Sequence, residues 1–260
     1  MKGGMRRIAA LVKLSLLELW RRNDMFVLLV LALVLLVPLS LARPFGTAGA
    51  TRYFDEAALL LIWGYSLFVA LGTGGRLFSN EFANRTVYPL LAKPVSRGQL
   101  LLGKYLGAVA ASWSALAFFY VLWALSALLR GGELLTPCFF QAFVLHATFM
   151  ALAVAAAVAG SFLLTPSASA TLLAIHFPGM FFFGRRLLDY AENVSGVLRG
   201  LVAAVYWVAP HAEFFDMRQR LVHGWGGVEA GVFLAVVGYG VAYSAVLLLV
   251  ARFLFNRKSL

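Results

Sequence analysis

The stretch Leu134–Gly184, LLTPCFFQAFVLHATFMALAVAAAVAGSFLLTPSASATLLAIHFPGMFFFG, contains no aspartate, glutamate, lysine or arginine. A helix that crosses the hydrocarbon core of a membrane needs about 20 apolar residues, so this stretch is long enough for two. Thr165-Pro166-Ser167 is the expected break, because proline suits the first turn of a helix and not its interior. The stretch therefore predicts two consecutive membrane spans, over about 137–164 and 167–184.

The composition places the whole chain in the same class. Of its 260 residues, 62% are hydrophobic and 13% are charged, whereas a soluble domain has about a quarter charged residues. A soluble protein of this length cannot bury so much apolar surface, and a disordered one needs low hydrophobicity. We therefore expect an all-α polytopic membrane protein, a single domain over 1–260, with six transmembrane helices. The remaining four spans are predicted at about 25–42, 57–78, 98–129 and 230–254.

The charged residues are distributed unevenly between the two sides that six spans create. Six spans place both termini on one side, and the segments on that side hold 14 basic and three acidic residues, 14 minus 3 or +11. The segments on the other side hold eight of each. Cytoplasmic loops carry the excess of lysine and arginine. We therefore expect both termini in the cytoplasm, and basic side chains that meet anionic lipid rather than nucleic acid.

Two segments outside the spans have predicted structures of their own. Residues 5–22 carry apolar side chains at helical spacing among basic ones, which predicts an amphipathic helix on the inner membrane surface. The charged region before the first span is too long for a signal peptide, so a retained anchor is expected. The outer segment 185–229 contains the apolar run 200–212, which is too short to cross and includes Pro210. We expect a re-entrant or interfacial segment there.

The inner loop over 79–97 is the most structured polar segment. Glu81 and Arg85 are four residues apart and can pair on a short helix. Ser96 and Gln99 match a capping box, at which the third span is expected to begin. Four large apolar side chains stand among these charges: Phe82, Val87, Leu90 and Leu91. A solvated linker does not need them, so the loop is predicted to be a docking surface.

A glycine and lysine spacing at the start of the third span is weak evidence for a nucleotide site. Gly98-Gln99-Leu100-Leu101-Leu102-Gly103-Lys104 fits a phosphate-binding loop, but Tyr105 follows where magnesium binding needs serine or threonine. The stretch also follows no strand and runs into a membrane helix. Gly103 and Gly107 instead predict close packing between helices. We expect no ATP-binding site in this chain.

Histidines supply the other candidate sites. His146 and His176 fall within the fourth and fifth predicted spans, where ionisable residues are functional hypotheses. They are compatible with helix packing, with a substrate path, or with haem ligation by both imidazoles. The outer segment contains four metal-ligating residue types without the spacing of a metal site: His211, Glu213, Asp216 and His223. The single cysteine, Cys138, excludes an intrachain disulfide and a cysteine-rich metal site.

The inner loop and the start of the third span also resemble a known family. The residues that carry the resemblance are Glu81, Arg85-Thr86, Leu90-Leu91, Lys93-Pro94-Val95-Ser96-Arg97 and Gly103-Lys104-Tyr105-Leu106-Gly107. Together they are similar to the signature of ABC-2-type transporter permeases. They most resemble the branch that includes permeases for the maturation of multicopper enzymes such as nitrous oxide reductase. Arg85 departs from the wider superfamily, in which many members have glycine before the threonine.

The resemblance implies a transport mechanism. In this family two permease chains, identical or related, pair with two cytoplasmic ATPase subunits that bind ATP and magnesium, so the permease itself carries no cofactor. Most members export, and the expected location is a bacterial cytoplasmic (inner) membrane. The loop after the second span contains a coupling helix that docks on the ATPase. This assigns ATPase contact and loop geometry to Glu81, Phe82, Arg85, Thr86, Lys93 and Arg97.

Two alternatives to transport stay open at this point. One is a membrane cytochrome subunit that binds haem through His146 and His176. The other is an ABC-linked module that senses or assembles without moving a substrate. No motif in the predicted spans identifies the transported substrate.

Overall fold

A computed structural model describes residues 2–20, 48–83, 95–129 and 136–257, together with positions 30, 33 and 34. Within these ranges the chain is helical and has no β-strand. The helices are α1 (Lys2–Trp20), α3 (Ala48–Ala83), α5 (Arg97–Leu129), α6 (Pro137–Leu163), α7 (Pro166–Asn193), α8 (Val197–Val208), the 3₁₀ helix η1 (Ala212–Phe215), α9 (Arg218–His223) and α10 (Ala230–Arg257).

Five of these helices are long and apolar enough to cross a membrane, which confirms the predicted all-α polytopic class. The candidate spans are Arg52–Phe78 within α3, all of α5, all of α6, Ser167–Leu187 within α7, and all of α10. The predicted span over 25–42 lies almost entirely outside the described residues.

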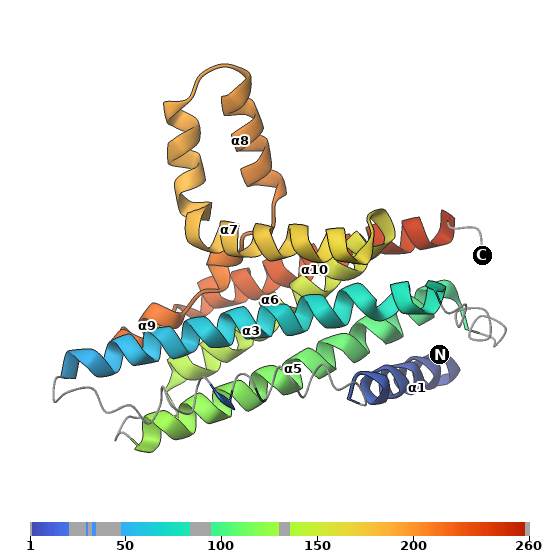
Figure 1. The fold of residues 1–260 in the computed structure, drawn as a ribbon, viewed down its shortest axis with the longest axis horizontal. Helices are drawn as coiled ribbons and strands as arrows, with labels where there is room; N and C mark the ends of the chain where they lie inside the picture. The colour runs from blue at the N-terminus through green and yellow to red at the C-terminus, as the bar shows by residue number, and fades with distance from the viewer. Residues whose placement is uncertain are drawn as a thin grey trace.

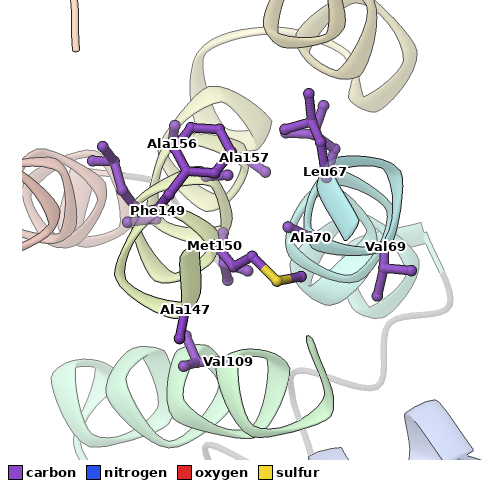
Figure 2. Close-up of a cluster of buried hydrophobic side chains, with 14 of the residues drawn as sticks. Leu67, Val69, Ala70, Val109, Ala147, Phe149, Met150, Ala156 and Ala157 are labelled. Carbon is purple, nitrogen blue, oxygen red and sulfur yellow. The ribbon is translucent and has the colours of Figure 1, made fainter. Parts of the chain in front are cut away.

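The long helices α3, α5, α6 and α10 form one bundle with α6 at its centre (Figure 1). α6 packs against α3, α5, α7 and α10. Figure 2 shows Ala147 of α6 directed toward Val109 of α5, and Met150 directed toward Ala70 of α3. Ala147, Ala155 and Ala159, which recur along one side of α6, are buried in this core.

Small residues let the neighbouring helices approach α6 closely, and backbone carbonyl oxygens of α6 accept hydrogen bonds from them. A Cβ atom at Gly74 of α3 would lie 2.9 Å from the Cβ of Ala157 and 2.9 Å from the carbonyl oxygen of Val154, closer than such atoms normally come. From α5, the indole Nε1 of Trp113 donates to the carbonyl oxygen of Ala147 at 2.7 Å. Interhelical hydrogen bonds of this kind satisfy polar groups where lipid offers no partner.

The break between α6 and α7 lies at the predicted Thr165-Pro166 step. The Thr165 hydroxyl accepts a hydrogen bond from the N–H of Ala168 at 3.4 Å, and Pro166 occupies the first turn of α7. The helix does not end at Gly184, where the charge-free stretch ends, but continues to Asn193. Charged side chains end an apolar run without breaking a helical backbone, because arginine is a good helix former.

α7 bends along its length, and its C-terminal part forms a hairpin with α8 that stands away from the bundle (Figure 1). α8 buries none of its side chains, and Trp207 is 74% exposed. Its 12 residues span about 18 Å, too little to cross a membrane. The apolar run over 200–212 is thus mostly helix, and the chain returns to the bundle through Pro210, η1 and α9.

The bundle has two distinct ends. α3 ends and α5 begins at the end that also holds α1 and the C-terminus of α10 (Figure 1). We call this the loop end. α9 lies toward the opposite end, and η1, which precedes it, packs beside the middle of α6 and α10. We call residues 209–229 the cap.

α1 packs along the first turns of α5. A Cβ atom at Gly103 would lie 2.6 Å from the Cβ of Leu11, and one at Gly107 would lie 2.6 Å from the Cβ of Ser15. Both pairs advance by four residues in the same direction, so the two helices run parallel at this contact. The predicted use of these glycines for close helix packing is confirmed, and α1 supplies the partner.

Candidate functional site

The predicted loop residues lie from the last turn of α3 to the first residue of α5. Glu81 and Phe82 occupy the last turn of α3, which extends to Ala83. Arg85, Thr86 and Lys93 fall outside the described residues. Arg97, the first residue of α5, is described in full. The two ends of the predicted loop are therefore fixed by long helices of the bundle.

The start of α5 has the capping box predicted from the sequence. The N–H of Gln99 donates to the Ser96 hydroxyl at 3.2 Å, and the N–H of Ser96 donates to Oε1 of Gln99 at 3.1 Å. This reciprocal pair satisfies two backbone donors that a helix N-terminus otherwise leaves without a partner. The position at which the chain leaves the loop is thus determined locally.

Arg97 connects the start of α5 to the end of α10. Its Nη1 donates to the carbonyl oxygens of Phe255 at 2.8 Å and Asn256 at 3.2 Å. The guanidinium carbon also lies 5.5 Å from the centre of the Phe255 ring, within the range of a cation–π contact. The last carbonyls of a helix carry partial negative charge, so a guanidinium there is favourable.

Lys104 lies about two turns further into α5 and is only 3% exposed. Its Nζ donates to the carbonyl oxygen of Leu77 at 3.4 Å and lies 5.8 Å from the centre of the Phe78 ring. The lysine therefore attaches α5 to the last part of α3. Sequence reasoning did not select it as a site residue, although a lysine at the edge of a long apolar run was a usable signal.

Three phenylalanines form a cluster between these two cations. The ring centres are 5.1 Å apart for Phe78 and Phe162, 5.5 Å for Phe78 and Phe255, and 5.4 Å for Phe162 and Phe255. They come from α3, α6 and α10 respectively. No pattern in the sequence pointed to this cluster, because each ring sits in a different apolar run.

The comparison with known proteins decides the family. Residues 66–260 match the family model described as ABC-2 family transporter protein. The chain belongs to the ABC-2 transporter family. The match begins within α3 and covers every later element. A search of curated proteins finds no match to the chain.

As an ABC-2 permease, the chain is a multi-pass membrane component of an ABC transporter. It is not itself the catalytic subunit, because ATP hydrolysis in such a transporter belongs to a separate ABC ATPase with which the permease works. The loop end, described above, is the part of this permease that the resemblance assigns to that partner.

The two membrane histidines of the permease are in different environments. In His146, Nε2 lies 2.7 Å from the Ser66 hydroxyl and Nδ1 lies 3.3 Å from the Tyr120 hydroxyl. Both ring nitrogens thus have protein partners, and haem ligation would break one of these hydrogen bonds. His176 packs edge-on against Phe177 on α7. This arrangement fits the packing interpretation of His146.

The four outer metal-ligand candidates do not assemble into one site. His211 Nδ1 lies 2.9 Å from Oε1 of Glu213, both side chains being buried. Asp216 instead pairs with Arg218, and His223 lies beside Glu56 at 3.9 Å. Among the described residues no group of three or more His, Cys, Asp or Glu side chains could hold a metal ion.

A pocket lies between the cap and the bundle. It has room for about one water molecule and is lined from α3, α5, α6 and the cap by Trp63, Tyr120, His146, Phe215, Asp216 and Arg218, among others. The Arg218 guanidinium stacks over the Phe181 ring at 4.4 Å and is hydrogen-bonded to Asp216. The stacking contact attaches the cap to α7.

Proposed function

We propose that this ABC-2 permease is the membrane subunit of an exporter, driven by a separate ATPase that docks on residues 79–97. The observation that carries the proposal is the loop end itself. The segment leaves α3 and enters α5 beside α1 and the C-terminus of α10, and its two flanking helices are anchored through Lys104 and Arg97. A docking element between two anchored helices can transmit force to the bundle.

Within this segment the residues have different proposed roles. Phe82 and Thr86 contact the ATPase groove, and Lys93 adds a basic group at the same surface. Glu81 and Arg85 brace the short helical part of the loop by pairing four residues apart. Arg97 sets the geometry of the loop from its far side, since its guanidinium is bonded to α10.

The arrangement in the membrane follows from the charge distribution. The loop end faces the cytoplasm of a bacterial cell, with the permease in the cytoplasmic membrane, because the loops that belong to this end hold the excess of lysine and arginine. Basic residues of α1 then meet anionic lipid headgroups. A second permease chain, identical or related, completes the transporter, and the translocation path runs between the two chains.

The test is the purified transporter with paired substitutions in the loop. Glu81→Ala with Arg85→Ala is expected to lower the amount of bound ATPase and the ATP hydrolysis of the reconstituted complex. The matched control is Arg185→Ala with Asp189→Ala, which removes an exposed acidic and basic pair at the same spacing in α7. Equal ATPase binding and hydrolysis in both double variants would show that the loop over 79–97 is not the docking site.

A further inference from the structure

We propose that Arg97, Phe78, Phe162 and Phe255 form a clasp through which movement of the coupling loop shifts α10 and reaches the cap. These are positioning residues, and the proposal rests on the proposed docking of an ATPase at residues 79–97. It adds the route by which that docking would act on the cap. We call this group of four the loop-end clasp.

The first step of the route is the direct bond between the loop and α10. Arg97 begins α5 immediately after the loop, and its Nη1 donates to two successive carbonyl oxygens, those of Phe255 and Asn256. These carbonyls belong to the last turn of α10, where a cation is favourable. A displacement of the loop-side end of α5 therefore pulls on the end of α10.

The second step is the aromatic cluster, which makes α3, α6 and α10 move together at this end. Phe78 is 1% exposed and Phe255 is not exposed at all. The rings of Phe78, Phe162 and Phe255 contact one another at centre distances of 5.1–5.5 Å. Close-packed interiors transmit displacement because they contain little free space to absorb it. The loop leaves from α3, so both of its flanking helices reach α10.

The third step depends on how α10 is held along the rest of its length. Only four of its residues are buried: Gly240, Ser244, Ala251 and Phe255. They form two buried groups, one at the loop end and one near the middle of the helix, and partly buried side chains such as Val236 and Leu247 also pack against the core. A Cβ atom at Gly240 would lie 2.5 Å from Cγ2 of Thr148 and 3.0 Å from the ring of Phe215. The middle contact is thus a tight one, so a shift of α10 is passed on to the residues packed against Gly240.

The middle contact joins α10 to the cap. Phe215 belongs to η1, is 2% exposed, and lines the pocket between the cap and the bundle. Tyr239, next to Gly240, accepts a hydrogen bond from the backbone N–H of His211 at 3.0 Å. When the clasp displaces Phe255, α10 shifts as one rigid helix, and the cap residues that contact Gly240 and Tyr239 are displaced with it. The cap is in this way connected to the coupling loop through α10.

The experiment is hydrogen–deuterium exchange of the permease–ATPase complex in nanodiscs, without nucleotide and after trapping with ATP, magnesium and vanadate. In the wild type, trapping is expected to change exchange at least about threefold in residues 252–257 and in η1, because these backbone groups share the displaced contacts. In the complexes that retain a bound ATPase, Arg97→Ala is expected to lose the change in both segments. Arg97→Lys, which retains one charged donor, is expected to keep part of it.

The matched control is Arg257→Ala. This arginine also lies at the end of α10 and stacks on a ring, that of Phe253 at 4.2 Å, but both residues belong to α10, so this cation–π contact does not join two helices. It is expected to leave the vanadate-induced change as in the wild type. A wild-type-sized change in Arg97→Ala would overturn the clasp. The clasp would also be overturned if, in the wild type with ATPase bound, trapping changed exchange at residues 79–97 but not at 252–257. That result would leave the proposed docking intact. Absence of any bound ATPase would overturn the proposed function and the clasp with it.

Discussion

Gly103→Ala tests the close contact between α1 and α5, the feature that attaches the N-terminal helix to the bundle. The new Cβ would lie 2.6 Å from the Cβ of Leu11 and 3.1 Å from its Cδ1. Carbon atoms prefer separations of about 3.5–4.0 Å, so the two helices must move apart by roughly 1 Å. Overpacking costs about 1–3 kcal/mol, partly offset by about 0.5–1 kcal/mol because alanine is the better helix former.

The net expectation is a loss of about 1–2 kcal/mol in the free energy of unfolding, or roughly 2–8 °C in Tm for a chain of this size. Thermal unfolding of the purified protein in detergent measures it, and limited proteolysis tests whether α1 is released first. The matched control is Gly64→Ala in α3, where a Cβ would meet nothing within 4 Å. Gly64→Ala is expected to be neutral or slightly stabilising. If both variants unfold at the same temperature, the inferred contact of α1 with α5 is wrong.

Three further substitutions test separate parts of the bundle by thermal unfolding. Gly184→Ala places a Cβ 2.4–2.7 Å from the buried carboxylate of Glu213 and should cost about 1–3 kcal/mol by breaking its hydrogen bond, whereas Gly179→Ala, with open space around it, should not. His146→Phe leaves two buried hydroxyls without their imidazole partner and should cost about 1–3 kcal/mol; a Soret band in the purified wild type that this change abolishes would instead establish haem. Thr165→Ala removes the cap of α7 and should cost about 1 kcal/mol; an unchanged Tm would show that Pro166 suffices.

The local sequence was sufficient to predict the long helices and the residues at which several of them begin. Apolar runs predict α5, α6 and α10 because a membrane helix must satisfy all backbone polar groups within itself. Thr165-Pro166 and Ser96 with Gln99 determine helix starts through side-chain bonds to nearby N–H groups. The predicted span at 167–184 lies within the candidate span Ser167–Leu187, and α7 continues beyond it to Asn193 because charge limits the membrane crossing but not the helix.

The contacts between distant segments were beyond sequence reasoning. Gly103 and Gly107 indicate close packing, yet nothing local identifies α1 as the partner, because that depends on how the chain returns through the bundle. Arg97 was assigned to ATPase contact and loop geometry, and the structure gives it a partner at Phe255, far away in the sequence. The phenylalanine cluster was missed for the same reason, since its rings come from three separate helices.

The central claim is that this ABC-2 permease works through a separate ATPase bound at its loop end. The most direct measurement is purification of the intact chain from its native membrane in mild detergent, followed by mass spectrometry of what accompanies it. We predict a stoichiometric soluble ATPase that carries its own phosphate-binding loop, and its loss when Glu81 and Arg85 are both replaced by alanine. A folded, intact permease that is repeatedly recovered without any such ATPase would contradict the account.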